Sequence, residues 1–284
     1  FNATLLRARV GASLENKRLR DEVRASLVRL ENELNAARML QLGMLPTTFP
    51  VWSAERPVQI HALMEPAREV GGDLYDFFYV SDSVFCFLVG DVSGKGAPAA
   101  MFMARTRSLV RMAVVLWQRL GTEDASPAQI AEAVNHELCQ DNRDRMFVTL
   151  FLGFLDTKSG VLAYINAGHP APHVLRGSGG IERINVKPEA PLGVRRDTAY
   201  QSRTVTLQPE DAVFVCTDGV AEAMNVGGEL YTDRRLDADL RAVCAAAPAD
   251  MIRNVKEHVD GFSGAAPKAD DITMLALRWQ PVQR

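Results

Sequence analysis

The first part of the chain carries a helical pattern of apolar positions. Residues 4–45 contain no proline and predict one long helix or two helices in series, ended by Pro46 and Pro50. Between residues 23 and 44 the spacing alternates between four and three, as in a coiled coil. The positions of this seam are Val23, Leu27, Leu30, Leu34, Ala37, Gln41 and Met44. The seam predicts a homodimer through a linker helix of residues 21–45; the alternative is that it packs on the neighbouring domain.

From residue 58 onward the pattern changes to short apolar runs separated by polar turns. Leu74–Val80 and Val84–Gly90 are rich in aromatic and β-branched residues, and the polar residues 81–83 between them predict a β-hairpin. Met146–Leu155 and Val161–Ile165 predict a second hairpin in the same way. Further strands are expected at Val58–Met64, His173–Leu175, Ile181–Ile184, Arg203–Leu207, Ala212–Cys216 and Ile272–Trp279.

Helical periodicity returns between these groups of strands. Ala99–Leu120 is one such segment, and a second helix opens at Ser126-Pro127 with Gln129 completing a capping box. Two more helices are expected near Arg234–Ala246 and Ala249–Phe262. Runs of strands followed by pairs of helices indicate an α+β fold in which antiparallel sheets carry helices on their outer faces.

Composition and charge narrow the class of protein. The chain has 284 residues, of which 47% are apolar, enough for one large domain or two small ones. Its net charge of −3 argues against nucleic acid as a partner. No apolar run approaches the roughly 18 residues of a membrane span, and no signal peptide is visible. The four cysteines lack CxxC spacing, which favours free thiols in a reducing cytoplasm.

Four aspartates stand where predicted strands begin or end: Asp73 in GGDLYD, Asp91 in VGDVSGKG, Asp218 in CTDG and Asp270 in ADDIT. No histidine or cysteine is directly beside any of them. Carboxylates without softer ligands suit magnesium or manganese rather than zinc or copper. A single aspartate of this kind is explained by its preference for turns. The set of four predicts a metal-dependent enzyme, with phosphoryl chemistry as the leading hypothesis.

The first hairpin places two of these carboxylates side by side. Residues 73 and 91 are equidistant from residue 82 in the turn, so Asp73 and Asp91 face each other with Cα atoms roughly 5 Å apart. Two like charges this close repel, and a bound cation relieves the repulsion. Asp218 follows one predicted strand, and Asp270 and Asp271 precede another. An antiparallel sheet brings such positions to the same rim.

The order of these motifs resembles that of the PPM serine/threonine phosphatases, specifically their bacterial SpoIIE/RsbU branch. The resemblance runs from about residue 37 to 278 and includes further signatures. These are Gln41 with Leu45-Pro46, Pro66-Ala67, Val70-Gly71-Gly72 before Asp73, Tyr75-Asp76, Phe147-Val148-Thr149, Asn166-Ala167-Gly168-His169, Pro191-Leu192-Gly193, Thr217-Asp218-Gly219-Val220 with Glu222, and Asp270-Asp271 with Thr273.

The resemblance implies an αββα sandwich that holds two manganese or magnesium ions at one end of its sheets. Asp91 would bridge both ions with help from the carbonyl of Val92, and Asp73, Asp218 and Asp270 would complete the ligand set. Asp271 either binds a metal through water or only caps its strand. A water activated by the metals would attack the phosphorus of phosphoserine or phosphothreonine, without a covalent phospho-enzyme.

Several neighbouring residues have two interpretations. Lys95 either touches the phosphate or is a solvated turn lysine, and the glycines at 71, 72, 94 and 96 either permit tight turns or cradle phosphate. His169 is either a general acid or structural. Animal PPM enzymes carry their candidate acid histidine beside the bridging aspartate, where this chain has Val92-Ser93-Gly94. Asp76 and Glu222 are either part of the site or hydrogen-bonding scaffold.

The N-terminal segment carries a second resemblance. Phe1-Asn2 and the residues that follow resemble the last helix of a CheY-like receiver domain, and similar helices end some GAF domains. The chain begins inside a helical pattern, so we expect it to be part of a longer protein. Residues 1–20 would then be the tail of an upstream receiver-like module, residues 21–45 the linker and residues 46–284 the phosphatase domain.

These features predict a cytoplasmic metal-dependent protein serine/threonine phosphatase that serves as the output of a response regulator. In the SpoIIE/RsbU branch the usual substrate is a phosphorylated STAS-type anti-sigma-factor antagonist. One alternative is a catalytically silent phosphatase-like switch that binds a partner. Another is a different carboxylate-based hydrolase such as a nuclease, which the acidic charge of residues 49–284 disfavours.

Overall fold

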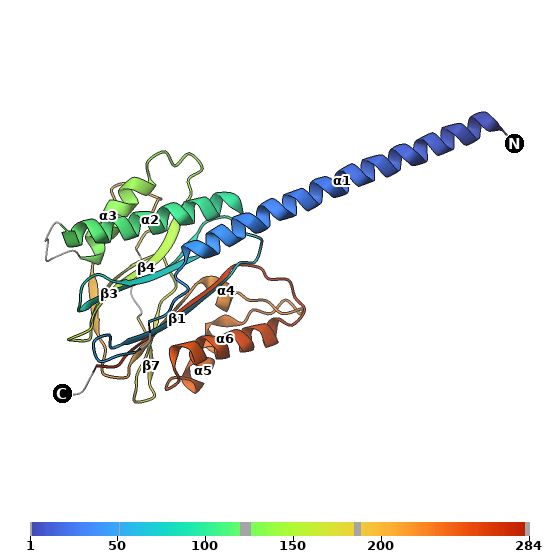
Figure 1. Ribbon diagram of the computed structural model, residues 1–284. Helices are drawn as coiled ribbons and strands as arrows, with labels where there is room; N and C mark the ends of the chain where they lie inside the picture. The colour runs from blue at the N-terminus through green and yellow to red at the C-terminus, as the bar shows by residue number, and fades with distance from the viewer. Residues whose placement is uncertain (1, 51, 120–125, 185–188, 282–284) are drawn as a thin grey trace.

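Two five-stranded antiparallel sheets lie face to face and carry helices on their outer faces (Figure 1). The computed structural model describes residues 2–50, 52–119, 126–184 and 189–281. The sequence prediction of an α+β fold with an αββα arrangement is therefore confirmed.

The first sheet has the strand order β1-β10-β9-β6-β7. Helices α5 and α6 cover its outer face, and a single turn of helix, α4, follows β9. The bounds are β1 Val58–Glu65, β6 His173–Leu175, β7 Ile181–Arg183, β9 Ala212–Cys216, β10 Ile272–Trp279, α4 Asp218–Ala221, α5 Thr232–Ala242 and α6 Pro248–Ser263.

The second sheet has the order β2-β3-β4-β5-β8 and is covered by α2 and α3. The predicted capping box is present, because Ser126 accepts from the backbone N–H of Gln129 and the Gln129 side chain accepts from that of Ser126. The bounds are β2 Leu74–Tyr79, β3 Val84–Val92, β4 Val148–Asp156, β5 Val161–Ala167, β8 Arg203–Thr206, α2 Ala97–Arg119 and α3 Pro127–Leu138.

The strands β3, β4, β9 and β10 are buried on both faces along most of their length, which explains why they read as nearly continuous apolar runs. Successive side chains of a strand point to opposite faces. In β3, Phe85, Phe87 and Val89 therefore enter the core between the sheets, while Cys86 and Leu88 pack beneath α2 and α3. Aromatic rings fill the inter-sheet core, with Phe87 and Phe151 centred 5.9 Å apart.

A buried ion pair fastens α2 to the second sheet. Asp76 of β2 is completely buried and accepts two hydrogen bonds of 2.7 Å from Arg111, while Arg107 lies 3.1 Å away. The guanidinium of Arg111 also lies 4.4 Å from the ring centre of Phe78. Asp76 thus has a structural role, because both of its carboxylate oxygens bind arginines of α2.

The N-terminal segment forms one continuous helix, α1 (Ala3–Met44), which projects away from the sandwich (Figure 1). The upstream part of the predicted seam is open to solvent, with Val23, Leu27 and Leu30 each more than half exposed. Near the end of the helix, Gln41 is buried against the sandwich. The alternative of packing on the neighbouring domain thus holds at Gln41, and a homodimer through the upstream part stays a prediction. No described helix is long and apolar enough to cross a membrane.

Candidate metal centre

The predicted pairing of Asp73 with Asp91 rests on the hairpin register, and that register is confirmed. Leu74 pairs with Gly90 and Tyr79 with Phe85, so the strands fold about residue 82 and the next step of the ladder sets Asp73 opposite Asp91. On its other side Asp91 pairs with Thr149 of β4. Asp91 is therefore fixed in the interior of a sheet.

The other two aspartates reach the same rim from the opposite sheet. Cys216 pairs with Met274 in the antiparallel pair of β9 and β10. Asp218 lies just beyond the end of β9, and Asp270 lies just before the start of β10. The expectation that the end of one strand and the start of the next share a rim is confirmed.

Thr217 joins the two halves of the site. Its hydroxyl donates a buried hydrogen bond of 2.8 Å to Oδ2 of Asp73 and accepts one of 3.0 Å from the backbone N–H of Thr273. This contact crosses from the first sheet to the second. Sequence reasoning did not single out Thr217 as a site residue, although it directly precedes Asp218 in the quoted motif.

The carboxylates are held in an environment that disfavours their negative charge. Burial, followed by the charge of Asp91, raises the pKa of Asp73 well above its usual value. Burial, followed by the charge of Asp218, raises the pKa of Asp91 to about 7. Burial and the nearby Asp270 also raise the pKa of Asp218. A divalent cation among these groups would reverse the effect by favouring the ionised forms.

Lys95 is an exposed residue whose ammonium group contacts this cluster. Its ammonium group is 3.0 Å from Oδ2 of Asp270 and donates a hydrogen bond to the carbonyl of Ala269. Its charge also favours the ionised forms of Asp218 and Glu222. Glu222 is an exposed residue at the end of α4, close enough to Asp218 for the two charges to repel.

Asp271 caps a loop with both of its oxygens. Oδ1 accepts a hydrogen bond of 2.7 Å from the backbone N–H of Ala67, and Oδ2 accepts one of the same length from Gly72. Of the two interpretations, these contacts favour the capping role. They fix the loop that carries Asp73 against the start of β10.

Two glycines make room for this arrangement. A Cβ atom on Gly72 would lie 2.8 Å from the carbonyl oxygen of Val92, and one on Gly219 would lie 2.0 Å from that of Asp271. Both positions need glycine because the backbone of a neighbouring segment comes too close for a side chain. Gly94 and Gly96 adopt positive φ angles of 88° and 76°, as expected for a tight turn.

His169 is buried behind the site. Its Nδ1 lies 3.0 Å from the hydroxyl of Thr149, and its backbone N–H donates to Asn166. Burial lowers the pKa of the imidazole to about 3, so the ring is neutral at ordinary pH. The structural interpretation of His169 fits these contacts better than the general acid.

The donor set suits a hard cation. Asp73, Asp91, Asp218, Asp270 and the carbonyl of Val92 are all oxygen donors. Among the described residues no three acidic, histidine or cysteine side chains form a ready-made metal site. Asp73 and Asp270 point to the partners they have here, Thr217 and Lys95. The residues therefore fit a cation once these side chains turn from those partners towards it.

Gln41 connects the long helix to the same loop. Its side-chain amide donates a hydrogen bond of 2.5 Å to the carbonyl of Gly71 and accepts one of 3.1 Å from the N–H of Gly71. A Cβ atom on Gly71 would collide with the carboxylate of Asp271. Gln41 was expected as a seam position and as part of the family signature, and neither of these predicts its contact with Gly71.

Two helix-covered antiparallel sheets with four aspartates at one rim define the class of protein as an αββα sandwich with a candidate hard-cation site. Comparison with known proteins gives the family. The family described as "Stage II sporulation protein E (SpoIIE)" matches residues 81–280. The chain belongs to the SpoIIE family.

Two curated relatives and two solved structures illustrate the match. Protein IcfG of Synechocystis is 31% identical over 279 residues, covering 90% of this chain and 42% of that protein. Phosphoserine phosphatase RsbU of Bacillus subtilis is 25% identical, covering 88% of this chain and 70% of that protein. The chain thus spans less than half the length of IcfG.

Among solved structures, the SiaA-PP2C domain of Pseudomonas aeruginosa has a TM-score of 0.76 at 21% identity and covers 90% of this chain and 99% of that domain. RsbX in complex with magnesium has a TM-score of 0.58 at 16% identity and covers 82% of this chain and all of that one. At these identities both structures show that the fold is shared.

Proposed function

We propose that the chain is a metal-dependent protein serine/threonine phosphatase that hydrolyses phosphoserine or phosphothreonine. The observation that carries the proposal is the gathering of Asp73, Asp91, Asp218 and Asp270 from two sheets at one rim. Asp73 lies in this cluster although burial and the negative charge of Asp91 both disfavour its ionised form. RsbU and RsbP of Bacillus subtilis, to which this chain is similar, are both named phosphoserine phosphatases, and their names support the same reaction.

Two manganese or magnesium ions would be held by Asp91 as the shared ligand, with Asp73, Asp218, Asp270 and the carbonyl of Val92 around them. Such ions supply positive charge for a phosphate dianion and lower the pKa of a bound water. The chain's own residues position the ligands: the sheet ladder fixes Asp91, and Asp271 fixes the loop that carries Asp73. Thr217 holds the carboxylate of Asp73 at the rim while no cation is bound. The magnesium complex of RsbX supports a hard-cation site in this fold.

The test compares hydrolysis of p-nitrophenyl phosphate by the wild-type chain with manganese against Asp91→Asn and Asp218→Asn. We expect both variants to lose activity while circular dichroism shows an intact fold. Asp82→Asn, an exposed carboxylate in the hairpin turn, is the matched control and should retain wild-type activity. Unchanged turnover in Asp91→Asn would refute the proposal.

The resemblance to the SpoIIE/RsbU branch implies that the preferred protein substrate is a phosphorylated STAS-type anti-sigma-factor antagonist. We expect the chain to act in the cytoplasm. We propose that an upstream receiver-like module controls it through α1, dimerised along the exposed part of the seam. The two hydrogen bonds between Gln41 and Gly71 support such control, because they join α1 to the loop that carries Asp73.

A catalytically silent switch that only binds a partner is the second candidate. It is distinguished by calorimetry with manganese. Metal binding by the wild-type chain together with turnover excludes it, and a failure to bind manganese supports it.

A further inference from the structure

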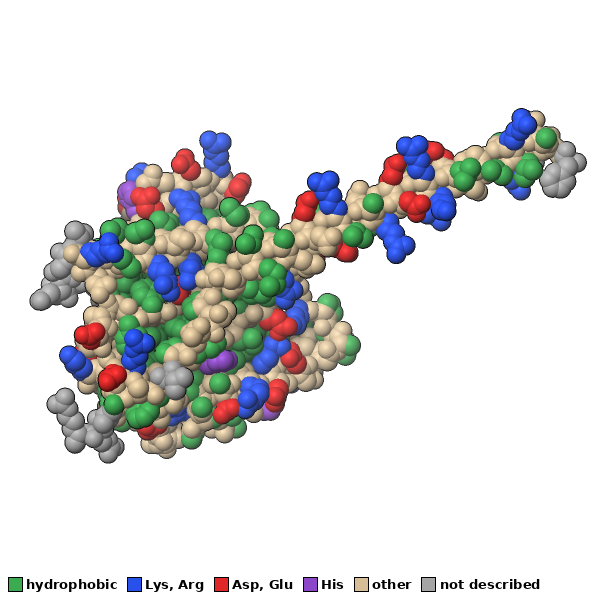
Figure 2. All heavy atoms as spheres, in the orientation of Figure 1, with side chains coloured by type: hydrophobic (Ala, Val, Ile, Leu, Met, Phe, Trp, Pro, Cys, Tyr) green, Lys and Arg blue, Asp and Glu red, His purple; other side chains and the backbone are tan. Residues whose placement is uncertain are grey.

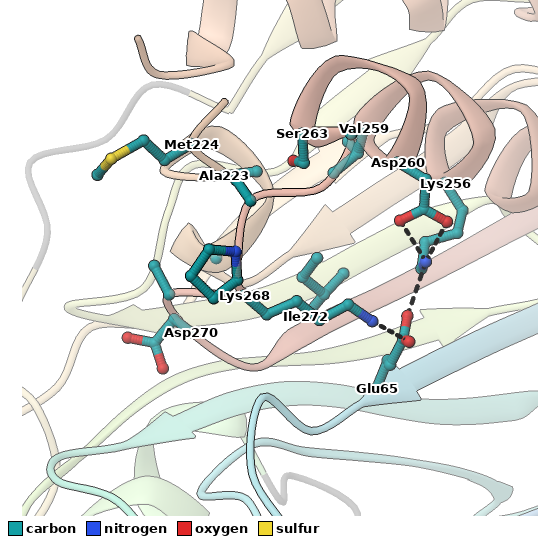
Figure 3. A pocket seen from close by; sticks show the side chains of 15 residues that line it. Glu65, Ala223, Met224, Lys256, Val259, Asp260, Ser263, Lys268, Asp270 and Ile272 are labelled. Carbon is teal, nitrogen blue, oxygen red and sulfur yellow. Dashed lines mark hydrogen bonds and ion pairs between the residues drawn. The ribbon is translucent and has the colours of Figure 1, made fainter. Parts of the chain in front are cut away.

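A cavity of about 290 Å³ opens directly beside the acidic rim. Its lining includes Gly219 and Asp270, which belong to the site, together with residues of α6 and of the loop between α6 and β10 (Figure 3). A peptide whose phosphorylated residue lies at the four aspartates can therefore place a neighbouring side chain in this cavity.

One wall of the cavity is formed by four charged side chains that form ion pairs with one another. Lys256 lies 2.7 Å from Glu65 and 2.5 Å from Asp260, and Lys268 is hydrogen-bonded to the other oxygen of Glu65. Figure 3 shows these ion pairs running along one side of the cavity. Two lysines face two carboxylates here, so the wall is electrically balanced and does not call for a charged ligand.

Apart from Ser263 and Asp270, the side chains that line the rest of the cavity are apolar. Ala223, Val259 and Ile272 are buried in the lining, and Met224 stands on the opposite side from the ion pairs with its side chain 41% exposed (Figure 3). The loop after Met224 carries two more exposed apolar side chains, Val226 and Leu230, at 80% and 42%. Exposed apolar side chains that cluster in this way are typical of a protein-binding or ligand-binding surface.

We propose that this cavity is a specificity subsite that receives one apolar side chain, of leucine or methionine size, from the phosphoprotein substrate near its phosphorylated residue. The inference rests on the proposed function and deepens it. The cavity volume of about 290 Å³ is just below the range of about 300–1,000 Å³ for small-molecule sites, which suits one side chain rather than a cofactor. The occupant follows from position, because the cavity shares Asp270 and Gly219 with the reaction centre.

The experiment uses phosphoserine peptides in an alanine background with a single leucine placed in turn at each of the three residues on either side of the phosphoserine. A parallel set carries aspartate at the same places. We expect one leucine position to raise kcat/KM by about ten-fold through KM, the size expected for burying one aliphatic side chain. The aspartate set should show no such gain.

Two variants locate the effect. Met224→Ser removes the apolar wall, and Ser263→Trp fills the cavity from the end of α6. Both should remove the leucine preference and leave hydrolysis of p-nitrophenyl phosphate within about two-fold of wild type. Met112→Ser, at an exposed methionine of α2 on the far layer, is the matched control and should keep the preference.

The outcomes separate the two proposals. If wild type does not hydrolyse p-nitrophenyl phosphate, the proposed function fails. If it does, the subsite is overturned by the absence of any leucine preference, by a preference for aspartate, or by a leucine preference that survives both Met224→Ser and Ser263→Trp.

Discussion

Replacing Asp91 by asparagine should stabilise the metal-free protein while removing its response to manganese. In the fold, burial and neighbouring carboxylates raise the pKa of Asp91 from 3.8 to about 7. The ionised form is therefore disfavoured in the fold relative to the unfolded chain. The resulting destabilisation begins as the pH rises above about 4 and is complete above about 7. Asparagine has no charge to lose and avoids it.

The magnitude follows from the shift. A difference of roughly three pKa units corresponds to about 4 kcal/mol at pH 8. Solvent screens part of this at a carboxylate that is not fully buried, so we expect Asp91→Asn to raise the free energy of unfolding by about 2–4 kcal/mol. For a chain of 284 residues that corresponds to a rise in Tm of about 3–7 °C.

The assay is thermal unfolding with EDTA at pH 8 and pH 5, and with manganese at pH 8. The gain of Asp91→Asn should shrink at pH 5, and manganese should raise the Tm of wild type but not that of the variant, because a ligand stabilises only the state that binds it. Asp82→Asn should behave as wild type throughout. A variant less stable than wild type in EDTA at pH 8 would refute the electrostatic reasoning.

Three further predictions test the parts around the cluster. Asp76→Ala should lower the free energy of unfolding in urea by about 3–5 kcal/mol, because it leaves Arg107 and Arg111 without their buried partner, while manganese affinity changes by less than about three-fold; a mild effect on unfolding would contradict its role as a scaffold. Gly72→Ala should abolish manganese binding in calorimetry, since its Cβ would lie 2.8 Å from the carbonyl oxygen of Val92; retained binding would exclude that carbonyl from the site. The NMR signals of the His169 ring should not titrate between pH 5 and 8, given a pKa lowered to about 3 by burial; a titration near pH 6.5 would reopen its role as an acid.

The sequence predicted contacts between distant residues best where the position of a turn or the order of two strands determines which residues pair. The turn centred on residue 82 determined the register that sets Asp73 opposite Asp91, because an antiparallel ladder leaves one pairing once its turn is known. The rim shared by Asp218 and Asp270 followed from the antiparallel order of their strands in the same way.

Contacts between segments that no local rule connects were not predictable. Asp270 and Asp271 are adjacent and identical in type, yet one pairs with Lys95 and the other caps the loop of Ala67 and Gly72. Their difference depends on where a loop of the other sheet lies. Gln41 occupies a seam position, but its burial against Gly71 follows from how the end of α1 docks on the sandwich. The short helix α4 was missed because four residues show no periodicity.

The central claim is that the four aspartates form one metal centre, and anomalous diffraction at the manganese edge from crystals grown with manganese tests it most directly. We predict anomalous peaks within bonding distance of the carboxylates of Asp91 and Asp218, with Asp73 and Asp270 turned towards them. Well-ordered manganese elsewhere on the molecule, with no peak at Asp91, would contradict the account.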